Sequence, residues 1–464
     1  MKNANLILSS FMIKHIKEKN FHLKIGVVCN IPYICCYIWR CCIYCKKPTN
    51  IFYINWLRLN MALKTKYTVI DLFAGCGGLS LGLYQAGWNG IFAIEKNSFA
   101  FDTLKYNLID NNQHFIWPDW LPQTPHDINE ILEKYENQLK ALQGTIDLVA
   151  GGPPCQGFSM AGKRVEDDIR NNLVFSYIEF IKLVQPKLIL FENVKGFTYA
   201  FNKKSKETAI PYSKRVIDEL ISLNYNVKPY IIDFSEYGIP QKRTRFILVG
   251  VHTSVGSPEK FKELLDAEKY SFLKRKGLSV NVSLKEAISD LLQENGCVET
   301  PDRAGFTSGK YGDAESKYQE FLRGIYPQQH QIPDSHSFAK HTQQKLECYR
   351  NLLANYPIKG KRIDGKTRER WAIKQRGITI LDGDALSPTI TGHPEDCLHY
   401  CEPRIMTVRE CARIQSFPDW YEIKRKYTTG GKMRKVEVPR YTQIGNAIPP
   451  LFAELAGTIL KQML

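Results

Sequence analysis

From residue 67 onwards, short β-rich apolar runs alternate with amphipathic stretches, and this alternation constrains the fold more than any other feature. Apolar residues at helical spacing predict a helix that ends near Gly87 and further helices over 97–109 and 128–143. Buried strands are predicted at 67–73, 90–95, 146–152, 187–193, 226–234 and 244–251. Strands that alternate with helices form a mostly parallel sheet covered on both faces. We therefore expect an α/β fold with a doubly wound sheet.

This alternation stops near residue 252. The following segment, 253–376, is polar and rich in Gly, Lys, Arg and Tyr, with scattered helical stretches such as 283–293. Such a change indicates a second, smaller and less regular domain. Two basic clusters flank its later part, with eight Lys and Arg in 359–376 and seven in 424–440.

Charge is divided unevenly along the chain. The 464 residues carry a net charge of +16, and the first 60 residues supply +8 of it, with nine Lys and Arg against Glu18 alone. A positive surplus suits a polyanionic partner, although a soluble basic protein shows the same balance. The thirteen cysteines have neither the spacing of a disulfide framework nor two separated pairs that would hold zinc, which favours reduced cytoplasmic thiols.

Residues 25–45 form an apolar run that follows four lysines, a pattern that raises the question of a signal peptide or membrane anchor. Asn30, Pro32 and Arg40 interrupt the run, and no small-residue cleavage site follows it. Met61 then begins a sequence that enters the first strand within a few residues. We interpret residues 1–60 as an extension outside the fold, with a membrane anchor as the less favoured alternative.

A glycine-rich segment, DLFAGCGGLS at 71–80, joins the first strand to a helix. Its glycines allow the backbone to turn sharply and to approach a ligand, and the helix offers N–H groups to anionic ligand groups. The second strand ends at Glu95, where a carboxylate suits ribose hydroxyls. Alone, the loop could serve packing and Glu95 could be an exposed carboxylate. Together they indicate an adenosine-type cofactor.

Cys155 lies in the segment GGPPCQGFS at 151–159, directly after a predicted strand. Two glycines and two prolines fix this turn and present the thiol instead of packing it in the core. A lone cysteine is more often buried and inert, but a deprotonated thiol is the most nucleophilic ordinary side chain. The rigid loop therefore favours a nucleophile.

Glu192 ends the strand 187–193, which we expect beside the strand that precedes Cys155. A carboxyl group with a raised pKa can protonate a poor electrophile while a nucleophile attacks it; helix capping or a salt bridge is the alternative. The segment QKRTR at 241–245 leads into the next strand, where alternation places Arg243 and Arg245 on one face. Their guanidinium groups could bind a carbonyl oxygen, orient Glu192 or grip phosphate, and a solvated basic turn is the alternative.

Seven segments occur in a fixed order: DLFAGCGGLS, IEK, GGPPCQGFS, FENVKGF, QKRTR, RECARIQSFPD and QIGNAIPP. Over residues 67–464 this order resembles the bacterial DNA (cytosine-5) methyltransferase family of type II restriction-modification systems. PCQ, ENV and GNAIPP in this order make the resemblance very specific. It implies the Rossmann-like fold of S-adenosylmethionine-dependent methyltransferases and a smaller, irregular target-recognition domain.

The resemblance also implies residue roles. Cys155 would add to C6 of a cytosine flipped out of the duplex, so that C5 can take a methyl group from S-adenosyl-L-methionine. Glu192 would contact N3 and Arg245 would contact O2, with Arg243 as neighbouring support. The implied cofactor contacts are Phe73, Gly75, Gly77, Leu79, Glu95, Asp127 and Asn446. Lys163 and Arg164 would belong to a mobile loop that closes over DNA, and the chemistry needs no metal.

The family's domains carry over as a catalytic and cofactor-binding domain at 61–252, completed by 441–464. A target-recognition domain at 253–403 would face the major groove, and 404–440 would supply a bracing helix and hinge. The basic stretch 424–440, with a hairpin expected at 428–431, is a candidate DNA contact, and a solvated hairpin is an equal alternative.

Double-stranded DNA is the implied substrate. A cognate restriction endonuclease would share the target site without forming a stable complex, and the enzyme would be a cytoplasmic, nucleoid-associated monomer without membrane attachment. One alternative is a tRNA cytosine-5 methyltransferase of the same fold, which tends to have a smaller recognition region. Another is a non-catalytic DNA-binding relative, in which the nucleophile or the acid would be lost. An NAD-dependent dehydrogenase is disfavoured because FAGCGG lacks the G-x-G-x-x-G spacing.

Overall fold

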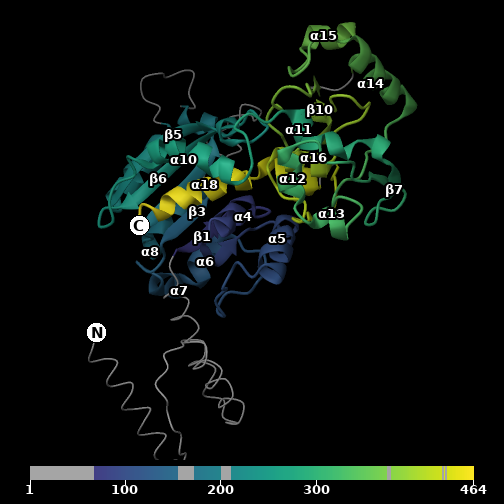
Figure 1. Cartoon of the computed structure of the whole chain (residues 1–464). Coiled ribbons are helices and arrows are strands. Elements are labelled where there is room, and N and C mark those ends of the chain that lie inside the picture. Colours follow the sequence, from purple (N-terminus) through teal and green to yellow (C-terminus); the bar gives the residue numbers. More distant parts are fainter. Residues whose placement is uncertain are drawn as a thin grey trace, which may run out of the picture. The chain divides into compact units, whose positions relative to one another are not determined.

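Six strands form the central sheet in a computed structural model of the chain (Figure 1). The structure describes residues 67–154, 172–199, 211–371, 373, 378–430, 433 and 436–464. The strands are β1 (Thr68–Leu72), β2 (Asn89–Ile94), β3 (Leu148–Gly151), β4 (Leu188–Val194), β5 (Tyr225–Asp233) and β6 (Thr244–His252). All six predicted strands are therefore present. Residues 1–60, interpreted above as an extension, lie outside the described residues.

The sheet has the order β2-β1-β3-β4-β6-β5. β1 to β4 run parallel, and of the six described strands only β6 runs in the opposite direction, because it pairs antiparallel with both β4 and β5. The expected mostly parallel sheet is confirmed. The reversal of β6 brings its first residues beside the last residues of β4, where Arg245 pairs with Val194.

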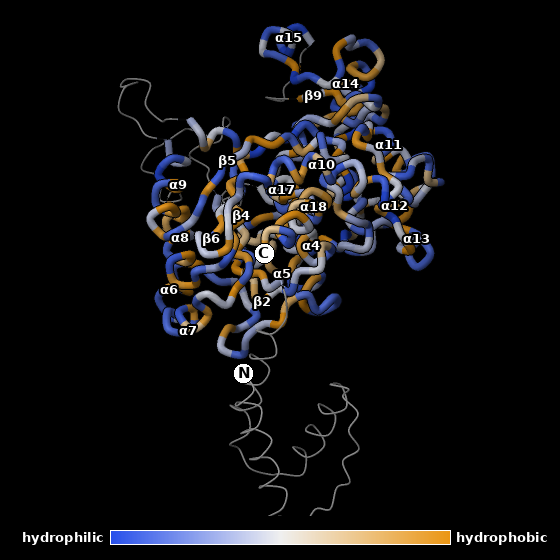
Figure 2. Tube along the Cα trace, turned by 60° about the vertical axis from the view of Figure 1, so that its left-hand side comes forward, coloured by the Kyte–Doolittle hydropathy of each residue, from blue (hydrophilic) through white to orange (hydrophobic). Residues whose placement is uncertain are grey.

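Two groups of helices cover the sheet, and Figure 2 shows them on opposite sides of it. One group comprises α4, α10 and α18, and the other comprises α6 to α9. The helices of this part of the chain are α4 (Gly78–Gln85), α5 (Ser98–Leu104), α6 (Ile128–Lys134), α7 (Glu136–Ala141), α8 (Asn172–Val184), α9 (Tyr212–Ser222), α10 (Phe261–Arg275), α17 (Arg440–Asn446) and α18 (Pro450–Lys461). The doubly wound arrangement follows from this distribution.

The first and last helices of the sheet domain, α4 and α18, pack closely. A side chain at Gly82 would overlap Ala453 and the carbonyl oxygen of Pro450, so only glycine permits this approach. At the far end of the pair, Lys461 Nζ donates to the carbonyl oxygen of Gly87 over 2.9 Å. The C-terminal helix is therefore part of the core that surrounds β1.

Three helix predictions need correction. The helix predicted over 128–143 is two helices, because Tyr135 leaves helical geometry at φ −120° and ψ 24°. The helix predicted over 97–109 is α5 followed by a π-helix at Lys105–Asn111. The stretch 283–293 holds only one short helix, α11 (Leu284–Ile288), followed by 3-10 turns.

A second hydrophobic core lies mostly within the region predicted for target recognition and extends two residues beyond its predicted end. Its buried members run from Tyr349 to Ile405. The remaining elements are α12 (Lys317–Arg323), α13 (Tyr326–Gln329), α14 (Gln343–Asn355), α15 (Gly365–Arg370), α16 (Val408–Ile414), β7 (Cys297–Glu299), β8 (Thr307–Gly309), β9 (Thr379–Ile380) and β10 (Cys397–Leu398). By contrast, α10 packs on α18 and joins the main core.

The described residues around the predicted hairpin, 424–430 and 436–440, contain no strand, and of its predicted turn at 428–431 only Gly431 lies outside them. None of the helices in the described ranges combines the length and apolar character that crossing a membrane requires.

Candidate active site

The ends of β1, β2, β3 and β4 meet the beginning of β6 at one edge of the sheet. Open α/β sheets bind ligands at this edge, outside the carboxyl ends of their parallel strands. The reversed β6 adds the basic segment 241–245 to the same edge. Residues far apart in the sequence are thereby brought together.

Glu192 and Arg245 form an ion pair at this edge. Arg245 Nε lies 3.0 Å from Glu192 Oε1, and both side chains are largely buried. Burial raises the pKa of Glu192, and the positive charges of Arg245 and Arg243 offset part of this rise. The carboxyl group therefore holds a proton more readily than an exposed glutamate does, which suits a general acid.

The pair lies against the segment that leads to Cys155. A Cβ added to Gly152 would be 2.9 Å from Glu192 Oε2. Asn193 Nδ2 donates to the carbonyl oxygen of Pro153 over 3.2 Å, which fixes the segment beside the end of β4. Cys155 itself lies outside the described residues, as do Lys163 and Arg164. Glu192 therefore lies against Gly152, which precedes the predicted nucleophile by three residues in the sequence.

Arg243 differs from Arg245 in its surroundings. Its guanidinium group is buried and donates to the carbonyl oxygens of Gly445 (3.1 Å) and Ala447 (3.0 Å). Its positive charge lowers the pKa of Glu192, but in the described chain it makes no hydrogen bond with that carboxyl group. Arg243 therefore ties the QKRTR segment to the C-terminal GNAIPP segment.

The glycine loop after β1 is held by Glu95 at the end of β2. Glu95 Oε2 accepts from the backbone N–H of Gly75 over 2.9 Å, and Oε1 accepts from that of Asn97 over 2.7 Å. Burial raises the pKa of Glu95, while these N–H groups lower it. Phe73 and Gly75 both have positive φ, at 58° and 57°, and a Cβ on Gly75 would meet no atom within 4 Å. The loop is thus sharply turned, with open space beside Gly75.

Two other residues predicted for this loop face the protein interior. A Cβ on Gly77 would be 2.6 Å from the hydroxyl of Tyr421, which donates to the carbonyl oxygen of Cys76. Leu79 is buried in the core within α4. In the described structure these two residues pack the loop against the protein core.

Asp127 begins α6 close to the end of β2. Its carboxylate accepts from the backbone N–H of Asn129 over 2.9 Å and lies 2.6 Å from Lys96 Nζ. Burial alone would raise the pKa of Asp127, but these two partners outweigh burial and lower it. The backbone N–H of His126 donates to the carbonyl oxygen of Glu95, so Asp127 is held at the same sheet edge.

Asn446 is the exposed last residue of α17. The segment that follows it lies against the start of α4, because a Cβ on Gly78 would overlap the carbonyl oxygen of Ile448. The GNAIPP segment therefore returns to the glycine loop after β1.

Sequence reasoning assigned no role to Asp71, the first residue of the glycine-rich segment. Its Oδ2 accepts from the Ser80 hydroxyl, whereas its buried Oδ1 has no partner among the described residues. Burial raises the pKa of Asp71 to about 7. Its position at the head of DLFAGCGG was the signal that could have marked it.

A buried pair of amides was also missed. Gln241 Nε2 donates to Gln415 Oε1 over 2.9 Å, and Gln415 Nε2 donates to the carbonyl oxygen of Ile444 over 2.9 Å. Gln241 Oε1 in turn accepts from the backbone N–H of Ile390 over 2.8 Å. These bonds connect the QKRTR segment, the end of α16, the recognition region and the C-terminal segment.

A family model for C-5 cytosine-specific DNA methylases matches residues 67–462. The chain belongs to this family. The prediction of a DNA cytosine-5 methyltransferase with an α/β methyltransferase fold is confirmed, and the dehydrogenase alternative is excluded.

Curated relatives support the same assignment. This methyltransferase is 31% identical to the type II methyltransferase M.DdeI of Desulfomicrobium norvegicum over 403 residues, which cover 83% of this chain and 86% of the relative. It is 28% identical to M1.HphI of Haemophilus parahaemolyticus over 436 residues, covering 92% and 93%. A solved structure from E. coli, described as a prophage-encoded DNA modification methyltransferase, aligns with a TM-score of 0.59 at 25% identity, covering 86% of this chain and 99% of the other.

Proposed function

We propose that this methyltransferase transfers a methyl group from S-adenosyl-L-methionine to C5 of a specific cytosine in double-stranded DNA, through a covalent adduct between Cys155 and C6. The observation that carries the proposal is the buried Glu192–Arg245 pair against Gly152, three residues before Cys155. The target base would be flipped into this site, since C5 and C6 cannot be reached inside a stacked duplex.

Each residue of the proposed site has a distinct task. The Cys155 thiolate forms a bond to C6, and Glu192 delivers its proton to N3 as the ring accepts the electron pair. Arg245 would donate to O2, and its ion pair with Glu192 holds that carboxyl group in position. Addition makes C5 nucleophilic. After C5 has taken the methyl group, the C5 proton is lost to a base. Expulsion of the Cys155 thiolate with return of the N3 proton to Glu192 then restores the neutral ring. Arg243 is a positioning residue in this scheme.

The residues around the glycine loop fit S-adenosyl-L-methionine. When bound, this cofactor supplies an electrophilic methyl group. The unpartnered Oδ1 of Asp71 suits its ammonium group, and the open space beside Gly75 lets a ligand approach the backbone. Glu95 lies at the strand end where ribose hydroxyls would donate to it, and Asp127 lies beside it. Phe73 and the exposed Asn446 would border the same pocket.

Replacing Glu95 with glutamine is expected to weaken binding of S-adenosyl-L-methionine roughly 10- to 100-fold, because hydrogen bonds to a charged group contribute about 1.5–3 kcal/mol. Isothermal titration of the cofactor against the protein without DNA measures this loss. Glu136→Gln, on the exposed face of α7, is the matched control and should leave the Kd unchanged. An unchanged Kd for Glu95→Gln in a protein that melts normally would contradict the role of Glu95.

We further propose that this methylation protects host DNA, since the relatives named above are type II methyltransferases. Such an enzyme would act as a monomer at the nucleoid. A cognate restriction endonuclease would share its target sequence without binding it stably. The predicted domain division at 252/253 and 403/404 also remains a proposal. The separate core between Tyr349 and Ile405 supports a second domain, whereas α10, α11 and α12 contribute to the main core.

The deciding experiment expresses residues 61–464 in a bacterial host without cytosine methylation and sequences the host DNA after bisulfite conversion. A short motif protected from conversion is expected with the unchanged chain and not with Cys155→Ser, because serine is a far weaker nucleophile. Soluble protein that binds the cofactor but protects no cytosine would refute the DNA assignment, and tRNA would then be assayed. Protection that persists in Cys155→Ser would refute the proposed nucleophile.

A further inference from the structure

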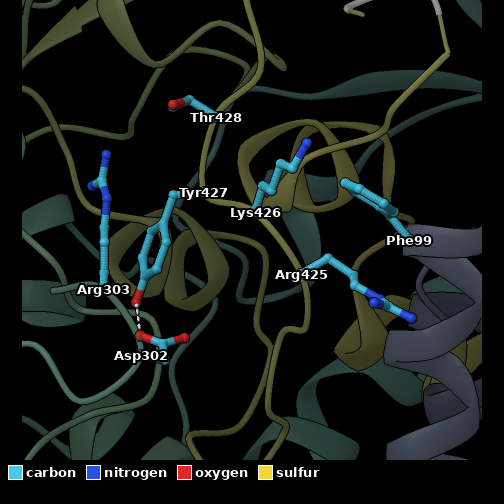
Figure 3. Close-up of a pocket in the computed structure, with 7 residues that line it drawn as sticks. All are labelled: Phe99, Asp302, Arg303, Arg425, Lys426, Tyr427 and Thr428. Atoms are coloured by element: carbon cyan, nitrogen blue, oxygen red, sulfur yellow. Dashed lines mark hydrogen bonds between the residues drawn. The ribbon is translucent and has the colours of Figure 1, made fainter.

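A pocket of about 470 Å³ lies beside the first turn of α5 (Figure 3). Three separate segments line it: Phe99, the dipeptide Asp302–Arg303 between β7 and β8, and the stretch Arg425–Thr428. α5 begins just after β2 ends, so the pocket opens near the sheet edge that carries Glu95 and Glu192. Nothing in the proposed chemistry uses it.

Arg303 is the distinctive residue of this pocket. Its guanidinium carbon lies 3.5 Å from the ring centre of Phe306 and 4.9 Å from that of Tyr427, so two aromatic rings fix the group. The side chain makes no ion pair or hydrogen bond anywhere in the described chain. A fixed guanidinium group with free donors matches the geometry of a phosphate, and little side-chain entropy remains to be lost on binding.

The other charges of the pocket already have partners. Asp302 accepts from the Tyr427 hydroxyl over 2.9 Å and pairs with Arg440, which neutralises the one carboxylate in the lining. Arg425 pairs with Asp102 on α5. Lys426 pairs with Glu437 over 2.7 Å, but its side chain is 60% exposed, and such surface pairs are weak enough to exchange partners.

Two of the basic side chains are directed toward one side of the pocket. In Figure 3, Arg303 and Lys426 extend toward the side on which Thr428 lies, while Arg425 turns away toward α5. The exposed Thr428 adds a hydroxyl, and Phe99 adds part of an aromatic ring. Two cations, a hydroxyl and an aromatic wall make up a site for a phosphodiester.

We propose that this pocket binds a backbone phosphate of the DNA substrate, away from the flipped base, with Arg303 as its principal donor. The inference rests on the proposed DNA substrate. β2 and β4 are three strand spacings apart, roughly 14 Å, so the pocket beyond the end of β2 and Glu192 on β4 lie at separate places along one sheet edge. A duplex whose base enters the active site would lie along this edge, and the pocket would meet its backbone away from that base.

The test compares Arg303→Gln with the unchanged chain in fluorescence anisotropy titrations of two unmethylated duplexes. One duplex contains the target motif found by bisulfite sequencing, and the other lacks it. Both affinities are expected to fall by the same factor, roughly fivefold at 0.15 M salt. The slope of log K against log salt should become shallower by about 0.9, as expected for one lost phosphate contact. The turnover number at saturating DNA and the Kd for S-adenosyl-L-methionine should not change.

Two further variants make the result decisive. Arg303→Lys keeps the charge and should retain most of the salt dependence, which separates a phosphate contact from a packing role between the two rings. Arg275→Gln removes an exposed arginine of α10 and should leave both affinities unchanged.

Unchanged DNA affinity and slope in folded Arg303→Gln would overturn this inference alone, whereas an unchanged chain that binds no DNA would overturn the proposed function. Thermal stabilisation by inorganic phosphate that Arg303→Gln abolishes, without any change in DNA binding, would show a site for free phosphate and overturn the assignment to DNA.

Discussion

Replacing Glu192 with glutamine is expected to lower the turnover number by a factor of roughly 10² to 10⁴, the usual contribution of a positioned general acid. Glutamine keeps the volume and leaves Arg245 an acceptor at 3.0 Å from its Nε, so the fold should persist. It cannot deliver a proton to N3 as Cys155 adds to C6. Single-turnover methylation with tritiated cofactor measures the chemical step directly.

The pH dependence provides a second readout of the same variant. Burial raises the pKa of Glu192 above the value of a free glutamate, and the protonated form is the active one. The rate of the unchanged enzyme should therefore fall as pH rises through this raised pKa. The Glu192→Gln variant should lack that component. Glu130→Gln, on the exposed surface of α6, is the matched control. A loss of less than tenfold for Glu192→Gln would refute its role as the acid.

Replacing Arg413 with methionine is expected to lower the free energy of unfolding by about 3–5 kcal/mol, because it removes the cation that two buried carboxylates share. Asp290 then keeps only Arg323, and Asp419 keeps only Arg409 and the Tyr311 hydroxyl, among their partners in the described structure. Arg413 Nη1 lies 2.6 Å from Asp290 Oδ1, and Nη2 lies 2.6 Å from Asp419 Oδ2. All three side chains are fully buried. This cluster joins α16 to the end of α11, so its loss should loosen the recognition region from the sheet domain.

Urea unfolding measures the change, and an exposed pair supplies the control. Arg275→Met removes the partner of Glu268 at the surface and should cost about 0–1 kcal/mol. Burial alone would raise the pKa of Asp419, but Arg413, Arg409 and the hydrogen bond from Tyr311 together outweigh burial and lower it. The stability that this carboxylate contributes is present above its unfolded pKa and is lost as pH falls through its folded pKa. The difference between the Arg413→Met variant and the unchanged chain should therefore shrink in acid. A cost below 1 kcal/mol at neutral pH would contradict the prediction.

The strands of the sheet could be predicted because they are buried on both faces and appear as continuous apolar runs, as in β1 and β3. The direction of β6 could not, since an apolar run is the same in either orientation. Its reversal nevertheless decides that Arg245 meets Glu192. Local backbone geometry was equally hidden, and the interruption at Tyr135 leaves no mark in the helical spacing.

Arg243 and Arg245 show why the site was only partly predictable. They are two residues apart and chemically identical, yet one lies beside Glu192 and the other binds carbonyl groups more than 200 residues away. The hydrogen bond between Gln241 and Gln415 likewise joins side chains that are 174 residues apart in the sequence. Partners of this kind depend on the folded path of the chain, which a motif does not contain. The motifs predicted the type of chemistry. Which of two similar side chains contacts Glu192 is determined by tertiary contacts.

The close packing of α4 against α18 has a consequence for biosynthesis. A ribosome makes α4 long before residues 450–461, so the face of α4 that packs on α18 stays uncovered until α18 has been made. The glycine loop that α4 anchors is completed at about the same stage, because Ile448 and the carbonyl oxygens that Arg243 holds are made just before α18. A nascent or truncated chain therefore lacks a completed site. In a cell whose genome is the substrate, methylation is therefore expected to begin only after α18 has been made and has packed against α4.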